Sequence, residues 1–273
     1  MQASFVINQT RYSVNLDQAL DISIPLNFYG AQPNTYNVPK AKAKAYQEGS
    51  FVGDTRQGGG CNFEQYQLIT HCVGTHTECI GHITDERLSI NEYLKDIFIP
   101  ATIISIEPEQ AFSTNDNYIP DKNETDLLIT KKILENALNK SNPNFLSALI
   151  IRTLPNDDSK KSRQYMNQQP PFLSIEAIQF INDLGIKHLI LDIPSLDRTM
   201  DDGKLTCHHI FWNVAQGKHK KDDNSAVNKT ITEMAFINNN ITDGNYFLNI
   251  QIPNFVADAA PSRLFLYKTN PLY

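Results

Sequence analysis

The sequence lacks several features that would assign its 273 residues to a class at once. No apolar run approaches the ~20 residues that a helix needs to cross a bilayer, so no membrane-spanning helix is expected. The amino terminus has no basic stretch followed by an apolar one, which argues against a secretory signal and for a cytoplasmic protein. Basic residues do not exceed acidic ones, and the net charge of -6 argues against nucleic-acid and membrane partners.

Cysteine is also scarce. The chain has only Cys61, Cys72, Cys79 and Cys207, and no two of them have the C-x-x-C spacing. A chain of this size with so few cysteines is not a disulfide scaffold, so reduced thiols in the cytoplasm are expected. Internal repeats and low-complexity tracts are absent too. With a hydrophobic content of 41%, the sequence predicts one domain over residues 1–273 with a sizeable core.

Short apolar runs alternate with helical patterns in the middle of the chain. Residues 100–107, 145–153 and 187–195 are apolar and rich in β-branched side chains, which predicts buried strands. Residues 130–140 and 174–185 have apolar positions at helical spacing, which predicts two helices. Helices that alternate with buried strands are typical of an α/β fold, and we expect a mixed β-sheet flanked by helices.

Two polar segments interrupt this pattern. Residues 27–60 are rich in glycine, proline, asparagine and glutamine, which predicts a long and mostly irregular segment of the kind that is usually functional. Its aromatic side chains could wall a substrate pocket, and ordinary packing explains them equally well. They are Phe28, Tyr29, Tyr36 and Tyr46. Residues 216–229 are charged with nearly balanced signs, which predicts a solvated loop.

The stretch "HCVGTHTECIGH", residues 71–82, concentrates groups that bind metals. On an extended strand, His76, Glu78 and His82 would project from one face. Two imidazoles and a carboxylate suit zinc, manganese or iron at a catalytic site that keeps one coordination position open. A lone histidine on a strand is more often structural. Three histidines within twelve residues, His71 included, favour a metal site.

One segment rarely completes a metal site, so a second cluster should contribute. The stretch "LDIPSLDRTMDDGKLTCHHIFW" offers Asp192, Asp197, His208 and His209. Its beginning lies at the carboxyl end of a predicted parallel strand, where α/β proteins place their sites. Further on, Glu233 stands within an apolar strand pattern, where a buried and unpaired carboxylate would be costly. Metal ligation would explain Glu233, and an exposed edge position is the alternative.

The stretch "HCVGTHTECIGH" resembles the H-x-x-x-H-x-D-x-x-x-H signature of the cyclase family, which includes the bacterial kynurenine formamidases. Further similar elements follow in the family's order from about residue 16 to residue 266: "LDISIPL" before the signature, then "ALIIRT", "LDIPSLD", "LTCHHIFW", "ITEMAFI" and "ADAAPSRLFL". This resemblance implies a fold of the swivelling β/β/α type. It also implies a homodimer or homotetramer with its site near the subunit interface.

The resemblance also implies roles for individual residues. His76 and His208 correspond to metal histidines, and Glu233 corresponds to the late metal carboxylate. Glu78 stands where the family usually has a bridging aspartate, and its additional methylene would shift the metals. His82 corresponds to the histidine that is expected to act as general acid or base.

The first metal histidine of the family pattern is displaced in this sequence. Strict spacing puts Cys72 at its position, one residue after His71. A one-residue bulge would let His71 bind, a Cys72 thiolate would favour zinc, and a weakened or lost metal position is the third possibility. We favour His71. The expected ligands of one or two zinc or manganese ions are then His71, His76, Glu78, His208 and Glu233.

By this resemblance the chain is expected to be a metal-dependent hydrolase that acts on a C–N amide bond of a small aromatic formamide. The reference reaction converts N-formylkynurenine to kynurenine and formate. A cyclase, lactonase or dehydratase that uses the same metal site is the first alternative. The second is a degenerate member that binds a small molecule without turnover. The third is a cysteine hydrolase, because Cys72, Cys79 and Cys207 each lie near a histidine.

Overall fold

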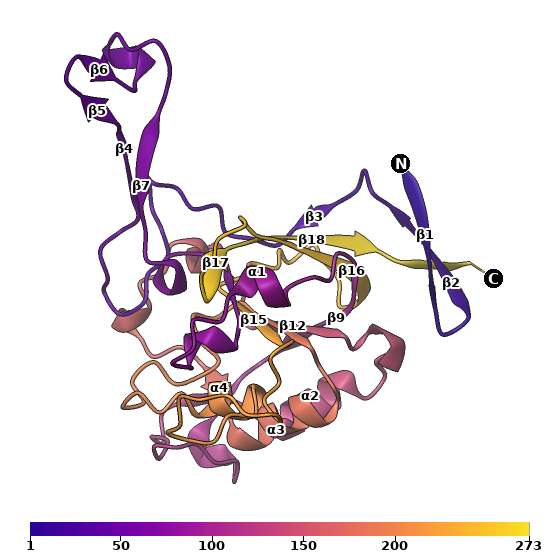
Figure 1. Ribbon diagram of the computed structural model, residues 1–273. Helices are drawn as coiled ribbons and strands as arrows, with labels where there is room; N and C mark the ends of the chain where they lie inside the picture. Colours follow the sequence, from indigo (N-terminus) through magenta and orange to yellow (C-terminus); the bar gives the residue numbers. More distant parts are fainter. Residues whose placement is uncertain (273) are drawn as a thin grey trace.

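The computed structural model describes residues 1–272, and its centre is a curled, mixed sheet of nine strands (Figure 1). The strand order is β17-β8-β15-β14-β12-β9-β16-β18-β3. Four parallel neighbours form the middle of this sheet: β9 (Ile99–Ile106), β12 (Ala148–Thr153), β14 (His188–Leu191) and β15 (Thr230–Glu233). The predicted α/β class with a mixed sheet is confirmed, and the three predicted buried strands are β9, β12 and β14.

Antiparallel strands flank this parallel middle on both sides. They are β16 (Gly244–Gln251), β18 (Arg263–Lys268) and β3 (Leu20–Asp21) on one side, and β8 (His76–Glu78) and β17 (Ala259–Pro261) on the other. Strands β17 and β18 follow each other in the chain, although they lie near opposite ends of the strand order. This short connection draws the two margins together, so the sheet is curled. A bridge between Ser23 and Ala235 reinforces the closure.

The helices lie together over one face of the sheet (Figure 1). They are α2 (Lys131–Leu138), α3 (Ile175–Asp183) and α4 (Thr206–Phe211), while α1 (Ile90–Tyr93) is a single turn beside the sheet margin. The side chains of Thr130 and Ser174 cap α2 and α3, since each accepts a hydrogen bond from a backbone N–H of the first turn. Both predicted helices are confirmed, with their ends moved inward by one or two residues.

The central strands are apolar throughout because both of their faces are buried. On β12, Leu149 and Ile151 face the core under the helices, whereas Ala148 and Ile150 face a second core on the opposite side of the sheet. Strand side chains alternate between the two faces, so a strand with two buried faces loses the polar alternation of a half-exposed strand.

Two smaller sheets complete the body of the molecule. One pairs β1 (Gln2–Ile7), β2 (Thr10–Asn15) and β19 (Asn270–Leu272), and the other pairs β10 (Glu109–Gln110), β11 (Leu127–Ile129) and β13 (Phe172–Leu173). Within residues 1–272, no helix has the length and apolar character needed to cross a membrane.

Residues 27–60 are less irregular than the sequence predicts. Strand β4 (Lys42–Ala45) pairs with β7 (Glu64–Gln67), and beyond them β5 (Gln47–Glu48) pairs with β6 (Phe51–Val52). Residues 42–67 thus form a hairpin arm that rises clear of the central sheet (Figure 1). The prediction failed here because these strands pair only with each other and carry no continuous apolar run. Residues 216–229 contain no helix or strand, as predicted.

Candidate metal centre

Strand β8 places two of the predicted site residues in the interior of the protein. It lies between β15 and β17, so both of its edges are paired, and His76, Thr77 and Glu78 are fully buried. His76 and Glu78 alternate with Thr77 and therefore share one face of the sheet. On the other face, Thr77 exchanges a hydrogen bond of 2.8 Å with Thr232 of β15.

The Glu78 carboxylate is the centre of a histidine cluster. Its Oε2 lies 2.9 Å from Nδ1 of His71 and 3.9 Å from Nε2 of His82, and its Oε1 lies 3.0 Å from Nε2 of His208. Glu78 comes from a strand, His71 and His82 from the turns on either side of it, and His208 from α4. Side chains from two separate segments of the sequence, residues 71–82 and α4, therefore meet at one carboxylate.

His71 and His82 reach the cluster on tight turns. His71 belongs to a 3₁₀ turn, Thr70–Cys72, and His82 to another, Ile80–His82, and their rings stack with centroids 4.1 Å apart. The expectation that one extended strand carries residues up to His82 is therefore wrong, because β8 ends at Glu78. The bulge expected at His71 is likewise replaced by a turn.

Cys72 belongs to none of the groups whose donor atoms converge at the centre. It is buried in an apolar cluster with Ala41 and Val73 at the base of the arm. His71, by contrast, offers Nδ1 to Glu78. Of the two residues between which the sequence left the first ligand open, the structure brings His71 to the centre.

Glu233 and His76 form the second part of the cluster. Glu233 is the last residue of β15, and its Oε2 lies 3.4 Å from Nε2 of His76. The other oxygen of Glu233 accepts a hydrogen bond of 3.0 Å from the backbone N–H of Leu196. Nδ1 of His76 lies 2.9 Å from the carbonyl oxygen of Gly74, which can accept a hydrogen bond but cannot donate one. This contact fixes the proton on Nδ1, so the lone pair of Nε2 in the neutral ring faces the centre.

A carboxylate outside the cluster orients His208. Oδ2 of Asp197 lies 2.6 Å from Nδ1 of His208, which leaves Nε2 turned toward Glu78. Asp197 also accepts hydrogen bonds from the backbone N–H of Cys207 and from the hydroxyl of Tyr118, each at 2.7 Å. A histidine whose far nitrogen is held by a carboxylate is the usual arrangement at metal sites. The sequence offered Asp197 as a site residue and gave no sign of Tyr118.

Asp258 is a further member that sequence reasoning missed. Its Oδ2 lies 2.9 Å from Nε2 of His71 and 3.6 Å from Nδ1 of His82. Asp258 immediately precedes β17, the strand that pairs with β8, so strand pairing alone carries it to the site. The sequence signal was available in "ADAAPSRLFL", which contains this aspartate.

Three buried polar atoms at the centre make no hydrogen bond of normal geometry among the described residues. They are Nε2 of His76, Nδ1 of His71 and Oε2 of Glu78, and the last two face each other as an ion pair at 2.9 Å. Ligand atoms of these three residues lie within 4.8 Å of one another, and a second such group joins Glu78, His82 and His208. Leaving buried polar atoms unpaired is costly, and a cation among them removes that cost. Imidazole nitrogens with carboxylate oxygens suit divalent zinc or manganese, so the donor set fits a metal.

The histidines and carboxylates of the centre stabilise each other's charged forms. Burial alone would raise the pKa of Glu78, yet the neighbouring His82, His208 and His71 hold it well below its usual range. Burial lowers the pKa of His71, but the carboxylates of Asp258 and Glu78 outweigh it and raise that pKa to about 10. The pKa of His208 is raised well above its usual value in the same way, against burial, by Asp197 and Glu78. A divalent cation would take over the charge compensation that protonated histidines provide without it.

Two residues of the second predicted cluster, Asp192 and His209, lie outside the centre, as does the neighbouring Ser195. Asp192 is bound by Lys160 at 2.7 Å and by Thr153, and Ser195 accepts a hydrogen bond from the backbone of Asp197. His209 turns away and directs Nδ1 to the carbonyl of Val214 at 3.2 Å. These polar groups stabilise the strand ends that carry the site.

The aromatic residues proposed for a substrate pocket separate into two groups. Tyr36 is partly exposed, and the preceding Thr35 donates a backbone hydrogen bond of 3.1 Å to the carbonyl of Cys72, next to His71. Phe28 packs on Tyr66, while Tyr29 and Tyr46 are exposed on or beside the arm. These last three do not line the centre.

The buried cysteines are poor candidates for a nucleophile. Burial raises the pKa of Cys72 to about 11 and that of Cys79 to about 12, and it raises the pKa of Cys207 well above its usual value. All three thiols are therefore protonated near neutral pH, whereas the thiolate is the reactive form. This geometry disfavours the cysteine-hydrolase alternative.

Comparisons with known proteins agree with the fold and the motif. The family model described as "Putative cyclase" matches residues 20–198. A kynurenine formamidase of Bacillus cytotoxicus is 22% identical over 196 residues, which cover 70% of this chain and 75% of that protein. Among solved structures, isatin hydrolase A from Labrenzia aggregata has a TM-score of 0.61 at 15% identity and covers 93% of this chain and 94% of its own. A predicted metal-dependent hydrolase from Bacillus stearothermophilus has a TM-score of 0.58 at 17% identity, with 92% and 98% covered.

Proposed function

This chain belongs to the cyclase family, and we propose that it is a metal-dependent hydrolase that cleaves a C–N amide bond. The reaction we propose is that of an arylformamidase, in which N-formylkynurenine and water give kynurenine and formate. One observation carries the proposal. His71, His76 and Glu78 bring buried donor atoms, none of them in a normal hydrogen bond, within 4.8 Å of one another, and His82 lies beside them with a carboxylate at its other nitrogen.

The proposed ligands of one or two zinc or manganese ions are His71, His76, Glu78, His208 and Glu233. Such an ion supplies a Lewis acid for the carbonyl oxygen and lowers the pKa of a water molecule toward ~7. The protein holds its donors in place beforehand. Gly74 fixes the tautomer of His76, and Asp197 fixes the ring of His208. Pre-oriented donors lose little entropy when the cation binds, which supports a site built for one.

His82 is the residue that we propose to move the proton. Its Nε2 faces Glu78 at 3.9 Å, and its Nδ1 faces Asp258 at 3.6 Å. Nε2 would accept a proton from the attacking water and deliver it to the nitrogen of the leaving arylamine, after which formate departs. Asp258 acts as a positioning residue, because a carboxylate at Nδ1 stabilises the imidazolium while the proton resides on the ring.

A small aromatic formamide is the substrate class that we propose, and the relative named kynurenine formamidase supports it. We propose that Tyr36, an exposed aromatic side chain that follows the contact of Thr35 with Cys72, packs against such a ring. The excess of acidic residues argues against nucleic acid and anionic membranes as partners. The four cysteines are unpaired, which supports the cytoplasm as the location that we propose.

The proposal is tested by metal analysis and a substrate panel. The untagged protein should contain about one or two equivalents of zinc or manganese by mass spectrometry. A His76→Ala/His208→Ala variant should lose this metal. The metal-loaded protein should release arylamine from N-formyl aryl amines at least ~10³-fold faster than the variant does. The panel includes a cyclic aryl amide and an aromatic lactone, which separate the formamidase from ring-opening activities.

The matched control is His209→Ala. His209 neighbours His208 on α4, but its ring is bonded to the carbonyl of Val214 and lies outside the donor set. This variant should keep its metal. Negligible metal in the wild-type protein, unchanged after incubation with zinc or manganese, would contradict the hydrolase proposal. Full metal without turnover of any formamide would contradict the substrate class alone.

A further inference from the structure

The candidate centre is open to solvent on the side of His82. The side chains of His82 and Asp258 have exposed fractions of 25% and 39%, whereas those of Glu78 and His208 have 0% and 2%. A substrate that approaches the centre from solvent therefore meets His82 before it meets the buried donors. The position of the His82 ring is then decisive for any proton transfer at the centre.

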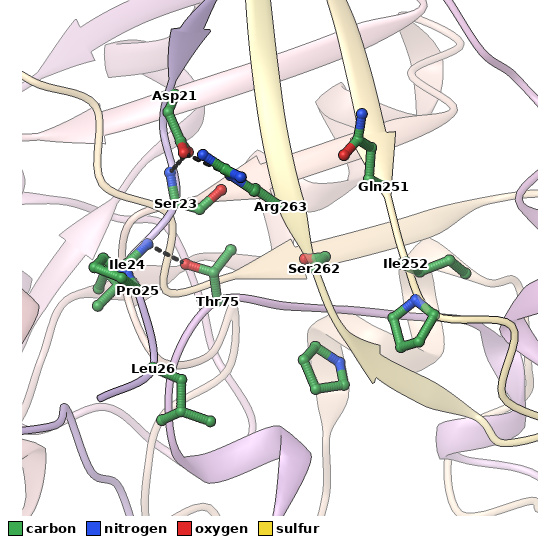
Figure 2. A pocket seen from close by; sticks show the side chains of 12 residues that line it. Asp21, Ser23, Ile24, Pro25, Leu26, Thr75, Gln251, Ile252, Ser262 and Arg263 are labelled. Atoms are coloured by element: carbon green, nitrogen blue, oxygen red, sulfur yellow. Dashed lines mark hydrogen bonds and ion pairs between the residues drawn. The ribbon is translucent and has the colours of Figure 1, made fainter. Parts of the chain in front are cut away.

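An open groove of about 860 Å³ lies on a different part of the surface, beside Thr75, the residue before β8. Figure 2 shows that the segments 21–26 and 251–253 form its two walls. Neither His82 nor any of the proposed metal ligands is among the described residues that line this groove. The groove therefore offers no route to the donors, and the side of His82 is the side to consider.

The turn that carries His82 has little support from the central sheet. Strand β8 ends before it, and His82 lies on the 3₁₀ turn Ile80–His82, where the backbone N–H of Ile83 bonds to the carbonyl of Ile80 at 3.1 Å. Residues 83–89, which follow, contain no helix or strand. Because the hydrogen bonds of a 3₁₀ turn have poorer geometry than those of an α-helix, a contact from elsewhere is needed to hold such a turn.

That contact comes from residues 214–221, which we call the strap. The carbonyl of His219 accepts a hydrogen bond of 2.6 Å from the backbone N–H of Asp85. Nδ1 of His219 lies 3.0 Å from the carbonyl of Ile83, and since a carbonyl only accepts, Nδ1 is the donor. One exposed residue of the strap thus binds the chain at two points directly after the turn of His82.

The strap is fastened to α4 near both of its ends. The backbone N–H of Val214 donates to the carbonyl of His209 at 2.9 Å, and the carbonyl of Val214 lies 3.2 Å from Nδ1 of the same histidine. Beyond the strap, the N–H of Ala226 donates to the carbonyl of Trp212, the C-cap residue of α4, at 2.8 Å. The strap therefore connects the helix that carries His208 with the turn that carries His82.

We propose that His219 is a positioning residue that holds the turn of His82 in place for proton transfer, an inference that rests on the role proposed above for His82. Nε2 of His82 lies 3.9 Å from Glu78 and Nδ1 lies 3.6 Å from Asp258, and both distances exceed hydrogen-bond length. The ring is therefore placed by the backbone of its turn. A displacement of about 1 Å can cost a reaction ~100-fold in rate.

The first test compares the kinetic constants of two His219 variants on an N-formyl aryl amine. His219→Leu removes the donor and keeps a side chain of similar volume, so kcat should fall at least ~10-fold. KM and the bound metal should stay at their wild-type values, because the contacts of His219 are with backbone groups of residues 83 and 85. His219→Asn returns an amide donor near the position of Nδ1 and should recover most of kcat.

The matched control is Lys220→Ala, which alters the exposed neighbour of His219 on the strap and should keep the wild-type kcat. An unchanged kcat in His219→Leu would overturn the proposal. So would a kcat that His219→Asn does not recover, or a loss of metal from His219→Leu.

The second test needs no substrate. Amide hydrogen exchange in residues 80–86, measured by mass spectrometry, should be at least ~5-fold faster in His219→Leu than in the wild type, since the turn opens more often without this hydrogen bond. His219→Asn and Lys220→Ala should exchange at the wild-type rate. Absence of formamide turnover in the wild type would contradict the proposed function, and exchange alone would then decide whether His219 holds the turn. Equal exchange in His219→Leu and the wild type would overturn the inference.

Discussion

Within residues 1–272, buried histidines meet carboxylates at the candidate centre and at His188, and the candidate centre alone of these two has the properties of a metal site. At the amino-terminal end of β14, Nδ1 of His188 contacts the hydroxyl of Thr230 at 2.8 Å and Nε2 contacts Asp96 at 3.0 Å. Both ring nitrogens are satisfied. At the candidate centre, Nε2 of His76 has no hydrogen-bond partner, and Nδ1 of His71 faces the Glu78 carboxylate at 2.9 Å without normal hydrogen-bond geometry. Converging unfilled lone pairs, and not residue type, distinguish a ligand set from a structural histidine.

The two clusters also differ in charge. Burial lowers the pKa of His188 to about 4, even though the nearby Asp96 opposes this effect, so the ring is neutral at physiological pH. At the centre, the carboxylates of Asp258 and Glu78 overcome burial and raise the pKa of His71 to about 10. The negative charge of one carboxylate beside a buried histidine is balanced by the groups next to it. Several carboxylates around several histidines attract a further cation, and a metal competes with protons for that place.

Removal of the His71 side chain should have the largest effect on the metal centre. His71→Ala should weaken metal binding by about 100-fold or more, because it deletes a converging donor together with the partner of Asp258. Cys72→Ala should keep its metal, since Cys72 packs with Ala41 and Val73. Affinities follow from competition with a chelator of known strength. Metal retained in His71→Ala and lost in Cys72→Ala would identify the thiolate as the ligand.

Most of the fold could be predicted from the sequence, because the patterns that indicate its main strands and helices are local. The buried strands β9, β12 and β14 follow from apolar runs, and α2 and α3 from helical spacing and capping. The arm was not predicted, since its strands β4 to β7 pair only with one another and carry polar side chains. Nor does a local pattern show that β17 and β18 join two margins of one sheet.

The sequence indicated most of the residues that form the site. It did not indicate which backbone elements carry them. The spacing of His76 and Glu78 on β8 predicted a shared face correctly. His71 and His82 arrive on 3₁₀ turns, whose geometry depends on contacts that the sequence does not display. Asp258 escaped notice because its role arises from the pairing of β17 with β8, a contact between segments 180 residues apart in the chain. A lone aspartate carries no periodic signal.

His188 should make the stability of the protein depend on pH. Its pKa is about 4 in the folded protein and about 6.5 in an unfolded chain, so between these values the unfolded chain binds a proton that the folded chain does not. This residue therefore reduces stability as the pH falls from 6.5 toward 4. His188→Gln removes that penalty, and its unfolding free energy should fall by about 2.5 kcal/mol less than that of the wild type between pH 7 and pH 4.5.

Urea titrations at the two pH values measure this difference directly, and metal content serves as the control. Because His188 lies outside the metal cluster, the variant should keep its full metal content. If the unfolding free energy of His188→Gln fell by as much as that of the wild type between the two pH values, His188 would not be held neutral in the folded protein. A loss of metal would remove the distinction between the two histidine clusters.

The smallest expected effect concerns the hydroxyl of Tyr118, which acts on the centre through two other side chains. It donates to Asp197, which in turn holds His208, and the Tyr118 ring packs edge-on against Phe172. Tyr118→Phe keeps the ring and removes one of four hydrogen bonds to Asp197. Metal affinity should fall about 10-fold, the lower end of what such outer contacts contribute. Tyr165→Phe, which alters a buried tyrosine without a bond to Asp197, should leave that affinity unchanged. Equal affinities in the two variants would mean that the backbone N–H groups alone orient Asp197 and His208.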